Sequence, residues 1–402
     1  MKYKIFGCKV NKYYLNQRLR FFEQSTENTD DLFLISTCEV TDRAKSKWLR
    51  ETKQAIKSWM RVAITWCGTL RQGKLIEESA FYALYPELLE RKDKILLLWE
   101  APEGEEQAAH TMFTPATNVY TKHFLMIQNG CDNHCSFCLT VMKRWKHWSR
   151  PLEEIIREIQ EVEANGGKEI VLTGVNLAAW GCSDTKKAEE TKFPQLLEAI
   201  LRQTTIPRIR ISSIGPEYAN DAFLEVVQNP RIMPHFHFSI QSFSDHVLGL
   251  MRRRYDKHTL HSLLTALRVQ WWPWVSLWAD LIVWFPWETE EDFLETLRGV
   301  EEFGITKAHI FPFSAHLKGE TIPAFYFPDQ VPLEIKKERE KRLIEVADRV
   351  RAEFIRAHQG TVHDVLLEER GKNGKWKWRT ENYLPVEIDW MYHRGDIVRL
   401  TY

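Results

Sequence analysis

Three cysteines lie close together in the middle of the chain, at Cys131, Cys135 and Cys138. Their C-x3-C-x2-C spacing places these loop cysteines on one short loop, directly after a strand-like apolar run. Three thiolates there can bind three corners of a cubic iron–sulfur cluster, which ordinarily takes four cysteines. The fourth iron would be open to a small chelating molecule, like the open position of a catalytic metal site. The alternative is a structural zinc site with His134 or His147 as fourth ligand.

Three further cysteines, here called the N-terminal cysteines, are Cys8, Cys38 and Cys67, which stand 30 and 29 residues apart. Each follows a short apolar run typical of a β-strand, and the ends of parallel strands meet at one edge of a sheet. We therefore expect a second set of three thiols that can hold a second open cluster. Taken singly, each would more often be a buried, inert cysteine. Cys182 lies in a predicted loop and is expected to bind nothing.

The composition is that of an ordinary globular protein, with 55 Lys+Arg against 55 Asp+Glu in 402 residues and 44% hydrophobic residues. Such a chain can bury a sizeable core and form two or three domains. It has no apolar run near the roughly 18 residues of a membrane span, and its first residues lack the features of a signal peptide. We therefore expect a cytoplasmic protein, in a reducing compartment where clustered thiols bind metals more often than they form disulfides.

The elements that must position these cysteines follow a βα order. Residues 1–100 predict a first domain with a parallel sheet, residues 101–118 a linker, and residues 119–331 a partial parallel barrel of six βα units. Active sites of such barrels lie at the carboxyl ends of the strands. The predicted strands are 4–6, 32–36, 62–65 and 95–98 in the first domain, and 125–129, 169–173, 208–213, 235–241, 279–283 and 307–313 in the barrel.

A long charged helix over 332–358 connects the barrel to residues 359–402. There, short alternating strands and a turn predict a small β-barrel; the strands are 362–367, 383–388 and 396–400, and the turn is 371–374. The predicted fold class is thus α/β, with an N-terminal parallel α/β domain, a central partial (β/α)6 barrel and a small C-terminal all-β barrel.

Several short motifs accompany the two cysteine sets: Gly7-Cys8-Lys9-Val10-Asn11, Ser36-Thr37-Cys38-Glu39-Val40-Thr41, Cys67-Gly68 and Arg208–Ile214. Together with the C-x3-C-x2-C loop, the hallmark of radical S-adenosylmethionine (SAM) enzymes, they resemble radical SAM methylthiotransferases over nearly all of the chain. Four motifs resemble the branch that acts on threonylcarbamoyladenosine beside the tRNA anticodon, more than the isopentenyladenosine or ribosomal-protein branches. They are Gly7–Asn11, Ile240-Gln241-Ser242, Met251–Tyr255 and His309–Ser314.

The resemblance implies two [4Fe–4S] clusters and two molecules of SAM. The loop cysteines would hold the cluster that cleaves SAM, and the N-terminal cysteines the auxiliary cluster that delivers sulfur. A 5′-deoxyadenosyl radical would abstract the hydrogen at C2 of the adenine, and a methylated sulfur would replace it. A cofactor has to carry this step because the C2–H bond is too inert for a general base. The C-terminal barrel resembles an RNA-binding TRAM domain, although a short one.

Polar residues at the other strand ends are candidates for holding SAM, although each could equally be a polar cap of its strand. These candidates are Thr173, Gly174, Asn176, Ser212, Ser239 and Gln241. Asp280 lies inside a predicted strand, where an unpaired carboxylate would be costly. We therefore expect it to have a partner such as an arginine or the ligand.

Basic residues predict an RNA partner. Residues 1–73 carry 14 Lys+Arg against 7 Asp+Glu, an excess that favours a polyanion. Further basic runs lie at 143–150, 252–254 and 370–379, and two of them contain tryptophan, which suits a stacked base of single-stranded RNA. Each run alone is more often a solvated face. Because they occur in all three domains, one extended RNA, the tRNA anticodon stem-loop, explains them better.

Tryptophan is unusually common, with 16 residues against only 18 glycines, whereas glycine ordinarily makes up about 7% of a chain. Six tryptophans stand where the family pattern has glycine in a turn. Such turns require a positive φ, which glycine adopts freely and tryptophan does not. They are Trp66, Trp145, Trp278, Trp284, Trp287 and Trp378, with Trp148 and Trp274 as weaker candidates. We hypothesise that the gene encodes glycine by UGA and was translated with tryptophan there. The alternative is genuine tryptophans that stack on RNA or pack at the barrel mouth.

The function expected from the sequence is methylthiolation of C2 of N6-threonylcarbamoyladenosine at tRNA position 37. The alternatives are isopentenyladenosine or a ribosomal protein as substrate, and, in another class, a zinc-stabilised RNA-binding protein without catalysis. The expected partners are an electron donor of the flavodoxin or ferredoxin type and a sulfur donor. We expect a monomer and no membrane association.

Overall fold

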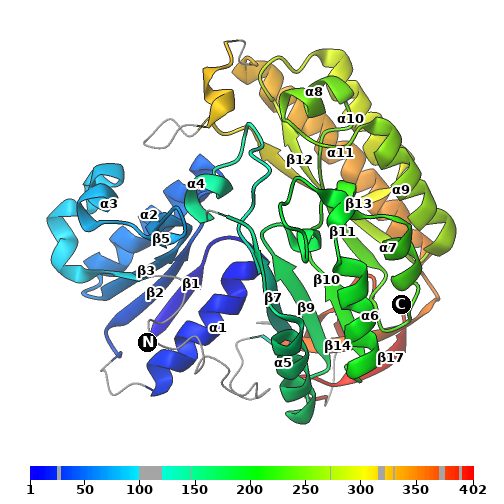
Figure 1. The fold of residues 1–402 in the computed structure, drawn as a ribbon, viewed down its shortest axis with the longest axis horizontal. Coiled ribbons are helices and arrows are strands. Elements are labelled where there is room, and N and C mark those ends of the chain that lie inside the picture. Colours follow the sequence, from blue (N-terminus) through cyan, green and yellow to red (C-terminus); the bar gives the residue numbers. More distant parts are fainter. Residues whose placement is uncertain are drawn as a thin grey trace. The chain divides into compact units, whose positions relative to one another are not determined.

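The computed structural model describes residues 1–24, 29–98, 120–144, 146–271, 273–315, 322–328, 331–370, 376–388 and 392–402. The predicted linker, 101–118, lies outside the described residues. The chain divides into two compact units (Figure 1). The first unit contains the described residues of Met1–Thr111, Gln128–Trp148 and Ser314–Tyr326, and the second those of Met112–Ile127, Ser149–Phe313 and Phe327–Tyr402. The loop cysteines and the N-terminal cysteines therefore belong to the same compact unit.

The first unit is built on a four-stranded parallel sheet of order β1-β2-β3-β6, as the βα order predicted. Its apolar core includes Ile35, Ile64, Phe81 and the rings of Trp48 and Tyr85. The strands are β1 (Lys2–Ile5), β2 (Leu32–Thr37), β3 (Arg61–Trp66) and β6 (Ile95–Leu98), with the short hairpin β4 (Leu70–Arg71) and β5 (Lys74–Leu75); the helices are α1 (Lys9–Gln24), α2 (Asp42–Lys57), α3 (Glu78–Leu84) and α4 (Thr140–Arg144).

The second unit contains the predicted partial barrel. Its strands form two sheets of order β10-β9-β7-β8 and β11-β12-β13, and single bridges from Ile209 to Ile232 and from Ile214 to Phe238 join them. The pairs β9/β10, β11/β12 and β12/β13 are parallel, which confirms the α/β class. The strands are β7 (His123–Asn129), β8 (Trp148–Ser149), β9 (Glu169–Gly174), β10 (Arg208–Ile211), β11 (His235–Gln241), β12 (Ser276–Val283) and β13 (Ile305–Pro312).

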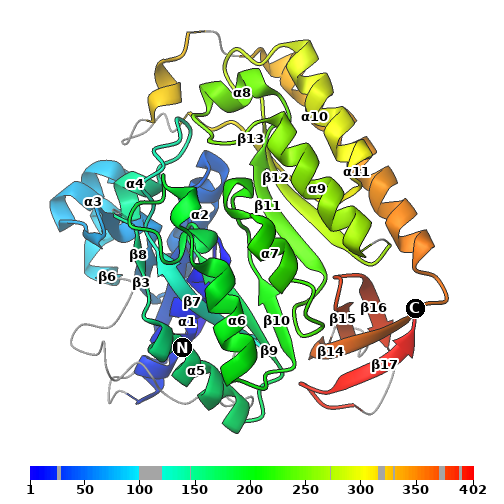
Figure 2. The ribbon, with the colours of Figure 1, turned by 45° about the vertical axis from the view of Figure 1, so that its right-hand side comes forward.

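Helices follow the barrel strands along the chain and pack through apolar faces, such as Ile155, Ile156, Ile159 and Val162 of α5. Figure 2 shows α9, α10 and α11 lying side by side against β11, β12 and β13. No helix among the described residues is long and apolar enough to cross a membrane. The helices are α5 (Leu152–Ala164), α6 (Phe193–Gln203), α7 (Asp221–Val226), α8 (Asp245–Leu250), α9 (Lys257–Trp271), α10 (Glu290–Glu302) and α11 (Leu333–Ala357).

The chain ends in an antiparallel sheet of order β16-β15-β14-β17, a half-barrel within the second unit. Its strands are β14 (Val362–Arg370), β15 (Trp376–Thr380), β16 (Pro385–Ile388) and β17 (Ile397–Thr401). The sequence predicted three of these strands and missed β15, whose residues were interpreted only as part of a basic run. The predicted turn at 371–374 lies outside the described residues.

A buried ion network fixes the first residues of β9 and β10. Glu169 is fully buried and pairs with Arg208 (2.8 Å), Arg210 (2.8 Å) and Lys122 (3.5 Å). Burial opposes its ionisation, but Arg210, Lys122 and Arg208 together outweigh that effect and hold the pKa of Glu169 well below its usual range. The same arginines donate to backbone carbonyls of the C-terminal sheet region, Arg208 to Asp364 (3.1 Å) and Arg210 to Glu381 (2.9 Å).

Glu169→Gln is expected to lower the free energy of unfolding by about 3–5 kcal/mol, because it leaves buried cations without their shared carboxylate. A carboxyl whose pKa is lower in the folded than in the unfolded state stabilises the folded protein at pH values above its unfolded pKa. That stabilisation is lost as the pH falls through the folded pKa. The free energy of unfolding of the variant should therefore decrease less than that of the parent protein as the pH falls. Urea unfolding at neutral and acidic pH measures both effects. The exposed Glu153→Gln should change stability by less than about 0.5 kcal/mol; equal effects of the two variants would contradict this account.

Candidate iron–sulfur and cofactor sites

The N-terminal cysteines gather at one edge of the parallel sheet. Cys38 and Cys67 directly follow β2 and β3, and Cys8 follows β1 after two residues. Burial raises the pKa of the Cys38 thiol, and the neighbouring charges of Cys67 and Cys8 raise it further. Gly7 has a φ of +123°, and a Cβ there would lie 3.1 Å from Cβ of Cys38. The three thiols thus form one crowded set whose ionisation a bound cationic cluster would favour.

Two polar side chains fasten the loops that carry these cysteines. Nδ2 of Asn11 donates to the carbonyls of Phe6 (2.8 Å) and Thr37 (2.9 Å). Oγ1 of Thr37 donates to the carbonyl of Thr65 (2.7 Å) and accepts from the backbone N–H of Gly68 (2.8 Å). Asn11 therefore ties the loop of Cys8 to that of Cys38, and Thr37 ties the loop of Cys38 to that of Cys67. The sequence marked both residues only as members of motifs.

The loop cysteines follow β7 in a tight turn. The backbone N–H of Cys138 donates to the carbonyl of Cys135 (3.2 Å), and that of Thr140 donates to Sγ of Cys138 (3.3 Å). Gly130, at φ +75°, must be glycine, because a Cβ would lie 1.9 Å from the carbonyl oxygen of Lys146. The turn therefore presents three thiols on a constrained backbone, as the spacing predicted.

Neither cysteine set has the geometry of a site for a single metal ion. Three tetrahedral thiolates on one zinc would place sulfur atoms about 3.8 Å apart, given Zn–S bonds of about 2.3 Å. Among the described residues, three potential ligand atoms lie within 4.8 Å of one another only at His237, Asp280 and His309. Nδ1 of His147, one of the two suggested fourth zinc ligands, shares a hydrogen bond with Nε2 of Gln128 (2.8 Å), which leaves its Nε2 available. Cysteines that bind different irons of a cluster stand farther apart, so the donor sets fit clusters better than zinc.

Arg144 links the two cysteine sets within the first unit. It ends α4, which follows the loop cysteines, and its Nη2 donates to Sγ of Cys67 (3.4 Å). Its Nη1 donates to Oδ1 of Asn129 (3.4 Å) at the end of β7. The sequence missed this role, because Arg144 stood there only as one member of a basic run.

The basic runs are less available to RNA than the sequence suggested. In the run 143–150, Lys143, Arg144 and Arg150 are buried. In the run 252–254, the largely buried Arg253 donates to the carbonyl of Ser239 (3.1 Å). Lys146, Arg252 and Arg254 of the same runs are exposed, so burial removes only part of each run from contact with RNA. Residues 371–375 of the third run lie outside the described residues.

The candidate SAM contacts stand at the carboxyl ends of neighbouring strands in the second unit. Thr173 and Gly174 end β9, Ser212 follows β10, and Ser239 and Gln241 lie near the end of β11. The hydroxyls of Thr173 and Ser212 are buried and make no hydrogen bond within the described part of the chain. Buried hydroxyls without partners are costly in a native protein, and a polar ligand would satisfy both. Nδ2 of the remaining candidate, Asn176, donates to the hydroxyl of Tyr218 (2.8 Å).

Four tryptophans adopt backbone conformations that favour glycine. Of nine described non-glycine residues with positive φ, four are tryptophan: Trp59 (+63°), Trp66 (+84°), Trp284 (+70°) and Trp287 (+67°). Trp66 also has a ψ of −149°, a region that essentially only glycine occupies. The buried indole N–H groups of Trp66 and Trp284 make no hydrogen bond among the described residues.

The other tryptophans in the hypothesis give a mixed result. Trp59, which the sequence did not single out, stands just after the Ser58 cap of α2, a common glycine position. Trp278 lies in β12 without positive φ, so its backbone does not require glycine. Trp378 lies in β15, and Trp145 lies outside the described residues.

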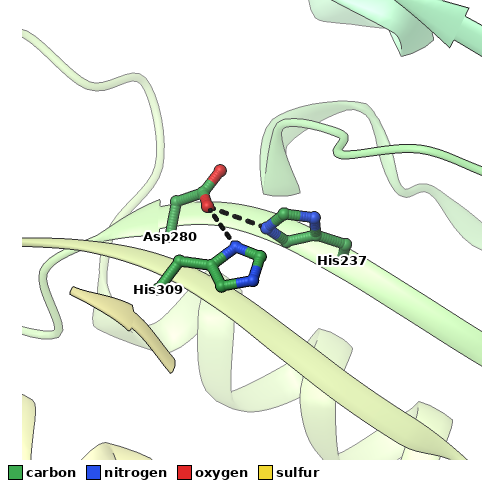
Figure 3. A group of neighbouring side chains, drawn as sticks. All are labelled: His237, Asp280 and His309. Atoms are coloured by element: carbon green, nitrogen blue, oxygen red, sulfur yellow. Dashed lines mark hydrogen bonds and ion pairs between the residues drawn. The ribbon is translucent and has the colours of Figure 1, made fainter. Parts of the chain in front are cut away.

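Asp280 has partners, as the sequence predicted, and they are two histidines where an arginine or the ligand was suggested. Figure 3 shows its Oδ1 between Nε2 of His237 (2.9 Å) and Nδ1 of His309 (3.1 Å). Burial raises the pKa of Asp280, but His237 and His309 together lower it well below its usual range. The carboxylate therefore stays ionised inside the barrel because two imidazoles surround it. We refer to these residues as the His–Asp–His cluster.

Comparison with known proteins agrees with these features. Residues 125–300 match the model of the radical SAM superfamily. The chain is 31% identical over 405 residues to "Threonylcarbamoyladenosine tRNA methylthiotransferase MtaB" of Bacillus subtilis (strain 168), covering 94% of this chain and 88% of the relative.

Two further relatives extend this comparison. The protein of the same name from Rickettsia prowazekii (strain Madrid E) is 30% identical over 409 residues, covering 98% of this chain and 92% of the relative. "tRNA-2-methylthio-N(6)-dimethylallyladenosine synthase" of Bacillus licheniformis is 30% identical over 403 residues, covering 92% and 76%. The chain therefore belongs to the family of radical SAM tRNA methylthiotransferases.

Proposed function

We propose that this enzyme adds a methylthio group to C2 of N6-threonylcarbamoyladenosine at position 37 of tRNA, beside the anticodon. The observation that carries the proposal is that one compact unit contains two complete sets of three thiols, neither arranged for a single ion. Two relatives named for threonylcarbamoyladenosine match 94% and 98% of the chain. Motifs such as His309–Ser314 resemble the same branch.

The family implies one [4Fe–4S] cluster and SAM, and we assign that cluster to the loop cysteines. The N-terminal cysteines would hold a second [4Fe–4S] cluster that provides the sulfur. When bound, this machinery supplies the radical that removes the C2 hydrogen and the methylated sulfur that replaces it. Asn11 and Thr37 hold the loops of the N-terminal cysteines in register, and Arg144 offers its positive charge to Cys67.

The residues proposed to bind SAM are Thr173, Gly174, Asn176, Ser212, Ser239 and Gln241. The buried, unpaired hydroxyls of Thr173 and Ser212 support this assignment, since SAM carries several hydrogen-bonding groups that could satisfy them. An electron donor of the flavodoxin or ferredoxin type and a separate sulfur donor complete the proposed cycle in the cytoplasm. The protein would act as a monomer.

The second candidate substrate is isopentenyladenosine, because a relative named for dimethylallyladenosine is 30% identical over 92% of this chain. Expression in a host that lacks its own tRNA methylthiotransferases separates the two substrates. We expect mass spectrometry of the tRNA nucleosides to show the methylthio form of threonylcarbamoyladenosine, with isopentenyladenosine unchanged. The reverse pattern would assign the enzyme to isopentenyladenosine, and an unchanged profile for both would remove tRNA as its substrate.

A further inference from the structure

The His–Asp–His cluster lies on one face of three adjacent parallel strands. The register pairs Asp280 with His309 and position 278 with both His237 and Lys307. Because side chains two residues apart on a strand point to the same face, Lys307 and His309 share the face of Asp280. This face therefore presents two imidazoles, one carboxylate and one ammonium group.

The cluster is partly exposed. The side chain of His237 is 8% exposed, that of Asp280 19% and that of His309 30%. His309 directs Nδ1 at Asp280, which leaves its Nε2 on the ring edge away from the carboxylate (Figure 3). His309 is the most exposed member of the cluster and keeps its Nε2 for a ligand, while Asp280 fixes the orientation of the ring.

A lysine, Lys307, lies beside the cluster on the same strand face. Nζ of Lys307 lies 4.4 Å from the ring centre of Trp278 and has no carboxylate partner among the described residues. Burial lowers the pKa of Lys307, and the positive charges of Arg379 and Arg351 lower it further. A half-buried ammonium in a positive environment is costly, and a bound anion would relieve that cost.

These charges decide between two kinds of ligand. The donor atoms of His237, Asp280 and His309 lie within 4.8 Å of one another and could, by spacing alone, surround a divalent cation. Such a cation would pair with the carboxylate of Asp280 but would share its strand face with the ammonium of Lys307. An anion would instead supply the counter-charge that Lys307 lacks among the described residues. The ammonium of Lys307 therefore favours an anionic group on this face, bound on the side of the cluster away from Asp280.

We infer that His309 and Lys307 form a subsite for the carboxylate on the threonylcarbamoyl group of the substrate, with Asp280 and His237 as positioning residues. This inference rests on the proposed function and names the part of the site that would select the substrate. Isopentenyl is purely apolar, so it would leave the half-buried Lys307 without a counter-charge. The subsite thus explains discrimination by a penalty on the wrong substrate as well as by contacts to the right one.

The test compares two anticodon stem-loops, one with threonylcarbamoyladenosine and one with its methyl ester, which keeps the shape but removes the negative charge. Dissociation constants and steady-state rates are measured for the parent protein, Lys307→Met and His309→Phe. We expect the parent to bind the acid about 10- to 100-fold more tightly than the ester, the range of a hydrogen bond to a charged group. In either variant this ratio should fall towards one.

Two control variants separate charge from folding. Lys307→Arg keeps the charge and should restore most of the preference for the acid. The exposed Lys341→Met on α11 is the matched control and should leave both dissociation constants unchanged. A thermal melt of each variant checks that the fold is intact.

The outcomes distinguish this inference from the proposed function. If the parent methylthiolates neither threonylcarbamoyladenosine nor its ester, the proposed function fails. If it methylthiolates both equally, and both substitutions leave the ratio unchanged, the subsite is wrong while the function stands. If equilibrium dialysis finds one Zn²⁺ or Fe²⁺ per chain that Asp280→Asn abolishes, the cluster is a metal site and the carboxylate subsite is overturned.

Discussion

Cys135→Ala is expected to abolish SAM cleavage and to leave the protein with about half of its iron, about four of about eight atoms per chain, since each cluster contains four. The reason is that the three loop cysteines have no spare thiol among them. Anaerobic reconstitution followed by iron and sulfide analysis measures the first effect, and formation of 5′-deoxyadenosine from SAM measures the second. Activity should fall below detection, because no other group of the enzyme can replace the radical.

Cys38→Ala gives the complementary result. It should also keep about four irons, but it should still cleave SAM to 5′-deoxyadenosine while forming no methylthio product. Cys182→Ala is the matched control, since Cys182 is a buried cysteine outside both sets, and its iron content should not change. If Cys38→Ala lost SAM cleavage as completely as Cys135→Ala, the separate roles of the two sets would be wrong. Two zinc ions and no sulfide in the parent would end the cluster assignment itself.

If glycine is the natural residue, the combined substitution of Trp66, Trp284 and Trp287 by glycine is expected to stabilise the protein. A genuine Trp66, which is fully buried against Tyr14, would instead leave a destabilising cavity. A bulky residue in a glycine-favouring conformation costs about 1–3 kcal/mol, so each position should contribute on that order. Replacing Trp66 and Trp284 should add to this effect, because it also removes buried indole N–H groups that make no hydrogen bond among the described residues. The apparent melting temperature, and the rate of methylthiolation, should both rise.

Trp48→Gly is the control for this prediction. Trp48 is fully buried in α2, and its Nε1 donates to Oε1 of Glu39 (3.2 Å). Its loss should cost about 3–5 kcal/mol from the cavity alone. If the triple glycine variant were destabilised to a similar extent, the tryptophans at positive φ would be genuine packing residues. The codons give an independent answer: UGA at positions 66, 284 and 287 supports glycine, and UGG contradicts it.

The sequence predicted those parts of the site that depend on local pattern. Apolar runs identify strands, so the sequence could show that the cysteines come after strands. Parallel strands bring their ends to one edge of a sheet, so it could also show that the cysteines gather there. The strands β7 and β9 to β13 were predicted for the same reason, whereas the two-residue strand β8 was not. The strand β15 was missed because its basic residues, interpreted as an RNA-binding run, concealed a short alternating strand.

The contacts that could not be predicted join residues far apart in the chain. Asp280 lies 43 residues from His237 and 29 from His309, and only the register of β11, β12 and β13 shows that they meet. Arg144 reaches Cys67 across 77 residues. A charge pattern cannot distinguish a solvated arginine from one that contacts a thiol, so the basic runs were assigned to RNA when several of their members are buried.

The measurement that tests the central claim most directly is reconstitution of the enzyme with iron, sulfide, SAM and a reductant, followed by incubation with an anticodon stem-loop containing threonylcarbamoyladenosine. Two forms of the protein are tested in parallel, one with tryptophan and one with glycine at positions 66, 284 and 287. The account predicts a product heavier by a methylthio group in place of hydrogen at C2, with 5′-deoxyadenosine formed in step. Full iron loading and SAM cleavage without any methylthiolated RNA in either protein would contradict it.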